Sequence, residues 1–119
     1  MKILVVDDSS FVRQCVRKYL LEQDTSNEII LADSGEEGFK FYQDTSPDLI
    51  ITDLLMPGMG GEAFVKKVRE IDKTTEIIVL TADVQKAVRE EIESLQISAF
   101  LNKPLNKEMI FKTLSEMKG

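Results

Sequence analysis

The sequence predicts an α/β fold in which a parallel sheet of five strands is covered by helices on both faces. Short apolar runs alternate along the chain with amphipathic stretches, as in a repeated strand-helix unit. The runs are apolar throughout, which is typical of strands buried on both sides. Because each right-handed crossover lays a helix over the strands, the pattern indicates a three-layer sandwich.

Five apolar runs are the predicted strands. They cover Ile3–Val6, Glu28–Ala32, Leu49–Thr52, Ile77–Thr81 and Ala99–Leu101. A helical pattern follows each of them. A chain of 119 residues with 43% hydrophobic content can bury a core of its own. We therefore expect a single domain over residues 1–119, with no linker and no attached output domain.

The first two helices are predicted from their faces and their caps. The apolar face expected for the first helix is made of Phe11, Cys15, Val16, Tyr19 and Leu20. Either Ser9 or Ser10 can cap that helix. A capping box, Ser34-Gly35-Glu36-Glu37, opens the second helix, which ends before Pro47.

Three further helices are amphipathic at helical spacing. Their apolar positions are Phe64, Val68 and Ile71 in the stretch from Glu62 to Ile71, then Val84, Val88, Ile92 and Leu95, and finally Ile110, Leu114 and Met117. Each can lay one apolar face on the sheet.

Composition excludes several classes of function. The formal net charge of −6 argues against a nucleic-acid partner, because phosphate backbones are bound by basic surfaces. The chain has no histidine, so Ser-His-Asp catalysis, Cys-His catalysis and His-ligated zinc are excluded. For the same reason the chain cannot itself be a phosphohistidine donor.

The expected location is the cytoplasm. Cys15 is the only cysteine, so the chain has no internal disulfide and fits a reducing compartment. No apolar run approaches the roughly 20 residues of a membrane span, and the N-terminus has no signal-peptide pattern. We expect a cytoplasmic protein with no membrane partner.

Chemically active side chains lie at the ends of four predicted strands. Asp7 and Asp8 follow the first strand, Asp53 the third and Lys103 the fifth, while Thr81 ends the fourth. Ligands bind beyond the carboxyl ends of strands in an open parallel sheet. Two carboxylates about 4 Å apart repel by roughly 4 kcal/mol at an effective dielectric near 20, so a cluster of three holds a proton or attracts a cation. An incomplete oxygen cage favours Mg²⁺ over Ca²⁺.

This set of groups could accept a phosphoryl group. A metal-bound Asp53 would form a mixed anhydride, with the metal and Lys103 countering charge on the transferring oxygens. Thr81 would hydrogen-bond the product. Each residue alone has an ordinary interpretation: a turn cap, a solvated lysine or a strand threonine. Their joint placement favours the functional interpretation.

These residues resemble the receiver domain of two-component response regulators, particularly the stand-alone, chemotaxis CheY-like kind, over essentially the whole chain. Asp7-Asp8 matches the family's acidic pair, and Asp53, in Asp53-Leu-Leu-Met-Pro-Gly58, matches its phosphoacceptor. Thr81-Ala82 matches the switch hydroxyl and its small neighbour, and Phe100 matches the switch aromatic. Lys103-Pro104 matches the family's lysine and the proline that follows it. The resemblance implies a flavodoxin-like fold with strand order 2-1-3-4-5.

The resemblance also implies roles for the site residues. Asp8, Asp53 and the backbone carbonyl of Leu55 would bind Mg²⁺ directly, and Asp7 would act through water. Phosphorylation would draw the Thr81 hydroxyl toward Asp53 and let Phe100 turn inward. The fourth helix, last strand and last helix would then form the readout face.

The implied partners are proteins. A sensor histidine kinase or a phosphotransfer protein would phosphorylate Asp53. The output would be contact with a flagellar switch, a phosphatase or another regulator, by a monomer or weak dimer. The chain would be a phosphoacceptor that assists its own phosphorylation and dephosphorylation, and not a turnover enzyme.

Two positions depart from the family pattern. Gly60 stands where many relatives place Asp or Asn ahead of the third helix, which predicts a weaker helix cap. Leu55 puts an apolar side chain at a position that borders the phosphoryl site, and Asp83 occupies another position that influences dephosphorylation. The lifetime of the phosphoryl group is therefore left open.

Four alternative functions remain. A phosphorelay intermediate would use the same chemistry, and a pseudo-receiver would bind partners without becoming phosphorylated. A Mg²⁺-dependent phosphohydrolase of the haloacid-dehalogenase kind would need Asp-x-Asp after a strand, where this chain has adjacent Asp7-Asp8. A flavodoxin proper would need a phosphate-binding loop there, and this acidic pair would repel FMN.

Overall fold

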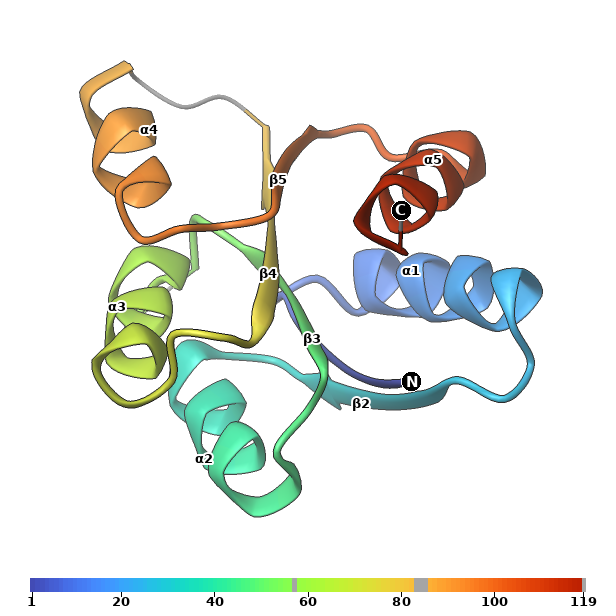
Figure 1. Ribbon diagram of the computed structural model, residues 1–119, viewed down its shortest axis with the longest axis horizontal. Helices are drawn as coiled ribbons and strands as arrows, with labels where there is room; N and C mark the ends of the chain where they lie inside the picture. The colour runs from blue at the N-terminus through green and yellow to red at the C-terminus, as the bar shows by residue number, and fades with distance from the viewer. Residues whose placement is uncertain (57, 83–85, 119) are drawn as a thin grey trace.

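Five parallel strands form one sheet in the order β2-β1-β3-β4-β5 (Figure 1). The computed structural model describes residues 1–56, 58–82 and 86–118. The strands are β1 (Lys2–Val6), β2 (Glu28–Ala32), β3 (Leu49–Asp53), β4 (Glu76–Thr81) and β5 (Ala99–Asn102). All five predicted strands are confirmed, with each end within one residue of its predicted position, and so is the flavodoxin-like order.

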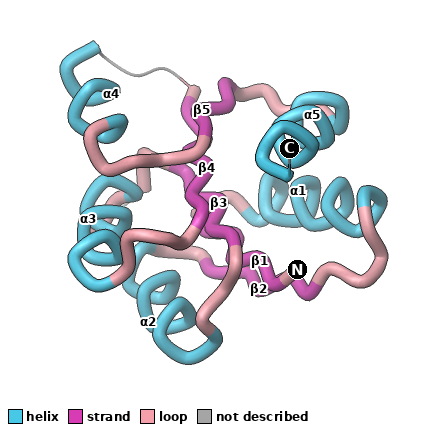
Figure 2. The backbone as a smooth tube through the Cα atoms, in the orientation of Figure 1, coloured by secondary structure: helices cyan, strands magenta, loops and turns pink. Residues whose placement is uncertain are grey.

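Helices cover both faces of the sheet. They are α1 (Ser10–Gln23), α2 (Gly35–Thr45), α3 (Gly61–Ile71), α4 (Lys86–Glu93) and α5 (Lys107–Lys118). Figure 2 shows α2, α3 and α4 on one side of the strands and α1 and α5 on the other. The predicted three-layer sandwich is therefore confirmed.

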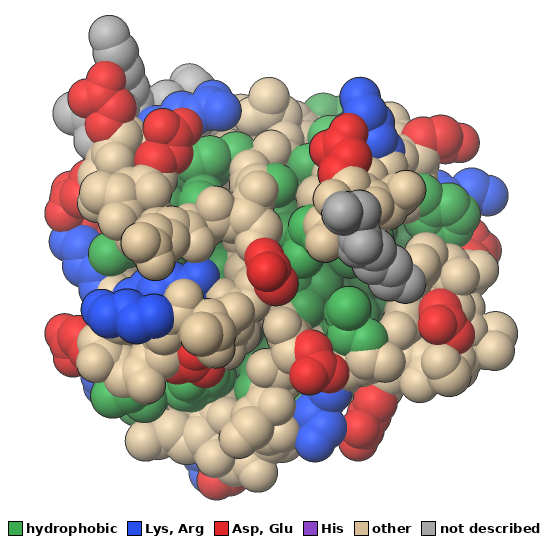
Figure 3. Space-filling view, in the orientation of Figure 1, with side chains coloured by type: hydrophobic (Ala, Val, Ile, Leu, Met, Phe, Trp, Pro, Cys, Tyr) green, Lys and Arg blue, Asp and Glu red, His purple; other side chains and the backbone are tan. Residues whose placement is uncertain are grey.

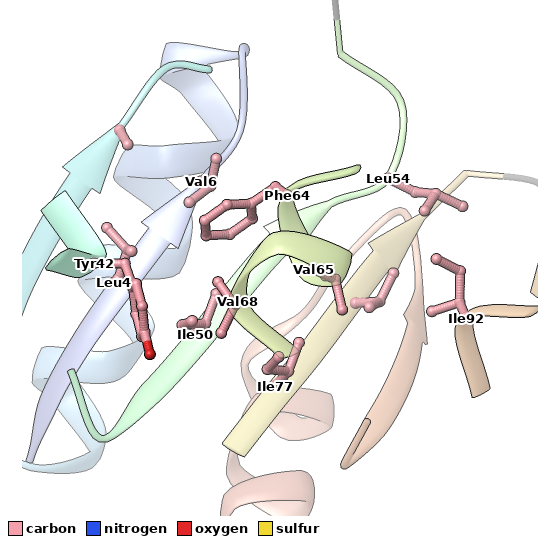
Figure 4. Close-up of a cluster of buried hydrophobic side chains, with 12 residues drawn as sticks. Leu4, Val6, Tyr42, Ile50, Leu54, Phe64, Val65, Val68, Ile77 and Ile92 are labelled. Atoms are coloured by element: carbon pink, nitrogen blue, oxygen red, sulfur yellow. The ribbon is translucent and has the colours of Figure 1, made fainter. Parts of the chain in front are cut away.

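The apolar strands supply two separate cores. Alternate residues of each strand point to opposite faces, so Leu4 and Ile50 face α2 and α3 while Ile3 and Leu49 face α1 and α5. Figure 4 shows Phe64 of α3 packed near the sheet in the first of these cores. Burial on both faces explains why the strand sequences are apolar throughout.

Two serines cap the first two helices as predicted. The Ser9 hydroxyl accepts a hydrogen bond from the Val12 N–H, and the Ser34 hydroxyl accepts one from the Glu37 N–H. The Glu37 carboxylate accepts from the N–H of Asp33, one residue before the position expected for a capping box. The prediction that Gly60 gives a weak cap is also confirmed, because it begins α3 without a side-chain hydrogen bond.

Two side chains predicted to lie on apolar helix faces are exposed instead. Phe11 is 77% exposed and Ile71 is 63% exposed. Phe11 lies in the first turn of α1, whereas the fully buried Val16 and Leu20 lie further along the helix. Ile71 is the last residue of α3. Cys15 is only half-buried, and Val84 lies outside the described residues.

A buried arginine joins α3 to the two segments that lead into β4 and β5. These segments lie at the amino ends of the strands, whereas the acids lie at the carboxyl ends. Arg69, on α3, is 5% exposed, and burial lowers the pKa of its guanidinium. It donates hydrogen bonds to the backbone carbonyls of Asp72, Thr75, Leu95 and Gln96. Arg69 therefore fastens the segment that follows α4 to α3. The sequence did not indicate this role.

Charges of both signs are scattered over the face of the molecule shown in Figure 3. Among the described residues of that face, no large area is basic. Within the described part of the chain, no helix is long and apolar enough to cross a membrane.

Candidate functional site

Three carboxylates converge at the carboxyl end of the sheet. Asp7 and Asp8 follow β1, Asp53 ends β3, and the two strands are direct neighbours in the sheet. Each of the three aspartates has a carboxylate oxygen within 4.8 Å of those of the other two. Asp7 is fully buried and Asp53 is 6% exposed, whereas Asp8 faces solvent. The clustering predicted from the strand ends is present.

Lys103 lies against two of these acids. Its Nζ is 3.0 Å from Oδ2 of Asp7 and 3.4 Å from Oδ2 of Asp53. The backbone N–H of Lys103 donates to the carbonyl of Thr81 at 2.7 Å, which fixes where the lysine leaves β5. The lysine predicted from the fifth strand end therefore reaches the acidic cluster.

The cluster carries more negative charge than Lys103 neutralises. Burial raises the pKa of Asp53, and the charge of Asp7 raises it further, although Lys103 acts in the opposite direction. Burial works against the charge on Lys103, but its hydrogen bond to Asp7 and the charges of Asp53 and Asp7 leave its pKa raised. A further cation beside Asp53 would be stabilised by this imbalance.

Both carboxylate oxygens of Asp7 have protein partners. Oδ1 accepts from the Ser9 N–H at 2.9 Å, and Oδ2 accepts from Lys103. The backbone carbonyl of Asp7 accepts from Nη1 of Arg13 at 2.6 Å. The sequence did not indicate this role of Arg13, since its place on the polar face of α1 predicts only solvent contact.

Thr81 supplies a buried hydroxyl at the end of β4. The residue is 3% exposed, and its Oγ1 has no hydrogen-bond partner among the described residues. Leaving a buried polar group unpaired costs about 1–3 kcal/mol. The hydroxyl is therefore able to donate to an acceptor that arrives at the site.

Phe100 lies on β5, next to β4. It is half-buried and pairs in register with Val79. The guanidinium carbon of Arg89, on α4, lies 4.7 Å from the centroid of the Phe100 ring. The sequence predicted the aromatic but not the cation above it, because this contact joins two elements whose relative position is set only by the fold.

The remaining predicted ligand is in the loop after β3. The side chain of Leu55 is 67% exposed, and it borders a cavity of about 320 Å³ together with Met56 and Lys66. The role of its backbone carbonyl stays a prediction. Asp83 lies outside the described residues.

A second cavity is lined in part by Lys103. It has a volume of about 530 Å³, and its lining includes Phe11, Cys15, Tyr19 and Pro104. The exposed Phe11 ring therefore borders the edge of the site.

The donor set suits a hard divalent cation. Carboxylate oxygens are the ligands that Mg²⁺ prefers, and two carboxylates with open positions for water and phosphate oxygens are typical of its sites. Asp8 and Asp53 meet this description, and Asp7, whose carboxylate oxygens already have protein partners, lies beside them. The residues present fit Mg²⁺.

The chain belongs to the family of response regulator receiver domains. The family model for the response regulator receiver domain matches residues 3–115. Members of this family bind Mg²⁺ at an acidic pocket and serve as phosphoacceptors in two-component signalling. The resemblance noted from the sequence is therefore confirmed.

Among relatives, the chain is similar to chemotaxis proteins of the CheY kind. It is 29% identical to the chemotaxis protein CheY of Bacillus subtilis over 118 residues, which are 97% of this chain and 95% of that protein. The structure of the chemotaxis response regulator CheY4 of Vibrio cholerae superimposes with a TM-score of 0.87 at 38% identity, covering 97% of this chain and 96% of that one. The chain is thus a CheY-like receiver domain.

A longer relative shares only this domain. The protein-glutamate methylesterase/protein-glutamine glutaminase of Bacillus subtilis is 34% identical over 100 residues, which are 84% of this chain but 28% of the enzyme. The match therefore carries no evidence of esterase or glutaminase activity in this chain.

Proposed function

We propose that this chain is a single-domain response regulator that accepts a phosphoryl group on Asp53 in the presence of Mg²⁺. The observation that carries the proposal is the position of Asp53, which shares a cluster with Asp7 and Asp8 and lies 3.4 Å from Lys103. The match over 95% of the length of Bacillus subtilis CheY supports a protein that works as one domain over residues 1–119.

The proposed donor is a phosphohistidine, which must lie on another protein because this chain has no histidine. A carboxylate oxygen of Asp53 forms the new P–O bond while the P–N bond of the donor breaks and the imidazole leaves. Asp8, Asp53 and the backbone carbonyl of Leu55 would hold Mg²⁺ directly, with Asp7 acting through water. When bound, the metal neutralises charge on the transferring phosphoryl oxygens.

Lys103 and Thr81 act on the product. Lys103 already lies between Asp7 and Asp53, so it can pair with a phosphoryl oxygen without a large movement. The unpartnered Thr81 hydroxyl gains an acceptor when the phosphoryl group arrives. Both interactions favour the phosphorylated arrangement over the unmodified one.

The signal is an inward turn of Phe100. When Thr81 moves toward Asp53 it vacates space beside β5 that the ring can fill. Hydrogen bonds to charged groups contribute about 1.5–3 kcal/mol each, and shifting a population from 1:99 to 99:1 needs about 5.5 kcal/mol. Two or three new contacts contribute about 3–9 kcal/mol together, a range that includes the free energy needed to operate the switch at Thr81 and Phe100.

The partners are proteins, and the pathway is chemotaxis or a similar phosphorelay. A sensor histidine kinase or phosphotransfer protein phosphorylates the chain, and a flagellar switch, phosphatase or other regulator reads the α4-β5-α5 face. The similarity to proteins named for chemotaxis supports the first pathway. The chain acts as a phosphoacceptor and not as a turnover enzyme.

A small phosphodonor tests the proposal without the kinase. The protein is incubated with acetyl phosphate and MgCl₂, and its intact mass is measured. We expect the mass of one added phosphoryl group, absent without Mg²⁺ and absent in Asp53→Asn. An adduct of the same size in Asp53→Asn would show that another residue is the acceptor.

A further inference from the structure

We propose that Glu36 is a positioning residue for the metal site, because it holds the loop that carries the Leu55 carbonyl. Oε1 of Glu36 accepts a hydrogen bond from the backbone N–H of Met59 at 2.5 Å. Glu36 lies in the first turn of α2, whereas Met59 lies between β3 and α3. The contact joins two segments that are far apart in the sequence. This inference rests on the proposed function.

Among the described residues of the β3–α3 loop (54–56 and 58–60), the other backbone hydrogen bonds lie near its ends. The Leu54 N–H donates to the carbonyl of Leu80 on β4, and the Gly61 N–H donates back to the carbonyl of Leu54. Gly60 gives α3 no side-chain cap. Glu36 therefore restrains the part of the loop where an Asp or Asn cap would otherwise act.

The sequence is adapted to this contact on the α2 side. A Cβ atom on Gly35 would lie 2.4 Å from the backbone oxygen of Met59, a distance that real Cβ contacts do not show. Glycine at position 35 thus lets the first turn of α2 approach the loop. The partial positive charge at a helix N-terminus also favours a carboxylate at position 36.

Restraint of the loop should strengthen Mg²⁺ binding, because the loop carries a predicted metal ligand. Leu55 follows Asp53 by two residues, so its carbonyl reaches the metal only when the loop keeps its path. The other predicted ligands, Asp8 and Asp53, lie at the ends of β1 and β3 and do not depend on Glu36. Loss of the Glu36 contact should therefore weaken Mg²⁺ binding without abolishing it.

Glu37 provides a matched control. It is also a glutamate in the first turn of α2, but its carboxylate accepts from the N–H of Asp33 and does not contact the loop. Glu36→Ala and Glu37→Ala remove the same charge from the same helix turn. Glu36→Gln removes the charge but keeps an oxygen that can accept from Met59.

The test is an NMR titration of the ¹⁵N-labelled full chain with MgCl₂. In the metal-free protein, Glu36→Ala should shift the Met59 amide and speed its hydrogen exchange. We expect Glu36→Ala to raise the Kd for Mg²⁺ roughly tenfold, as is usual when an outer partner of a metal site is lost. Glu37→Ala and Glu36→Gln should keep Kd values close to wild type.

Three results would overturn the inference. They are an unchanged Kd in Glu36→Ala, an equal rise in Glu37→Ala, and a Met59 amide that does not respond to Glu36→Ala. A different result marks failure of the proposed function: a wild-type protein whose amides near Asp53 do not respond to Mg²⁺. The response of the Met59 amide to Glu36→Ala is measured without metal, so it tests the Glu36 contact separately from the proposed function.

Discussion

Nζ of Lys103 lies 3.4 Å from Oδ2 of Asp53, at the ends of two strands that are not neighbours in the sheet. β4 lies between β3 and β5, and the hydrogen bond from the Lys103 N–H to the Thr81 carbonyl ties the lysine to β4. The predicted phosphoacceptor is thus joined to the strand that carries Phe100. Under the proposed mechanism, phosphorylation of Asp53 and movement of β5 would act through this one set of contacts.

Replacing Lys103 should destabilise the unmodified protein. In Lys103→Met the fully buried Asp7 loses its cationic partner, so we expect the free energy of unfolding to fall by about 3 kcal/mol. Urea denaturation measures the difference.

Lys107→Met is the control for that change. Its Nζ lies 3.8 Å from Glu22 on the protein surface, and loss of such an exposed pair costs at most about 1 kcal/mol. Equal losses of stability in the two variants would contradict the account of Lys103.

Thr81→Val should leave the unmodified protein as stable as wild type or more stable. The substitution removes a buried hydroxyl that has no partner among the described residues, so up to about 1 kcal/mol of unfolding free energy can be gained. Urea denaturation measures this change. In the same variant, a fluorine label on Phe100 should no longer respond to beryllofluoride with Mg²⁺, because the link to β5 is lost.

The comparison for Thr81 is Thr52, which is also buried. The Thr52 hydroxyl donates to the carbonyl of Asp53 at 3.0 Å, so Thr52→Val should lower the unfolding free energy by about 1 kcal/mol. A clear loss of stability in Thr81→Val would mean that its hydroxyl is already bonded.

Arg69→Lys should be strongly destabilising although it keeps the charge. The guanidinium donates to four backbone carbonyls, and an ammonium cannot reproduce this planar arrangement. We expect a loss of about 2–4 kcal/mol in urea denaturation. The same exchange at Arg17, an exposed residue of α1, should have little effect. Similar values for the two variants would refute the role of Arg69.

Alkaline pH should weaken the contact between Tyr42 and Asp72. The Tyr42 hydroxyl donates to Asp72 at 2.9 Å, and burial together with this hydrogen bond raises the pKa of Tyr42 to about 12 from its ordinary value of 10.0. Between these values the unfolded chain releases the proton and the folded one keeps it. Stability from Tyr42 is therefore complete below pH 10 and is lost as the pH rises toward 12, by about 1.4 kcal/mol per pH unit.

Tyr42→Phe isolates this effect from other groups that titrate at high pH. Urea denaturation of both proteins should show the wild-type advantage at pH 8 shrinking steadily above pH 10. A constant difference between the two proteins over that range would show that the pKa of Tyr42 is not raised by folding.

The sequence predicts the strands more accurately than the helix surfaces. Strands such as Leu49–Asp53 are buried on both faces, so an apolar run defines them with little ambiguity. A helix buries only a stripe whose width depends on the sheet beneath it. Phe11 and Ile71 have helical spacing, yet they lie at helix ends where that cover stops.

The sequence likewise predicts some contacts of the site and not others. Asp7, Asp53 and Lys103 could be predicted because parallel strands bring their carboxyl ends to one edge. The hydrogen bond from Met59 to Glu36 and the position of Arg89 over Phe100 could not be predicted. Those contacts depend on distances between loops and helices, which no local pattern encodes.

Chemical trapping of the phosphorylated residue shows directly whether Asp53 is the phosphoacceptor. After incubation with acetyl phosphate and MgCl₂, borohydride reduces an aspartyl phosphate to homoserine, and peptide mass spectrometry locates the product. We expect homoserine at position 53 alone, and only when both Mg²⁺ and the phosphodonor were present. Homoserine at position 7 or 8, or a phosphoryl adduct that leaves residue 53 unchanged, would contradict this expectation.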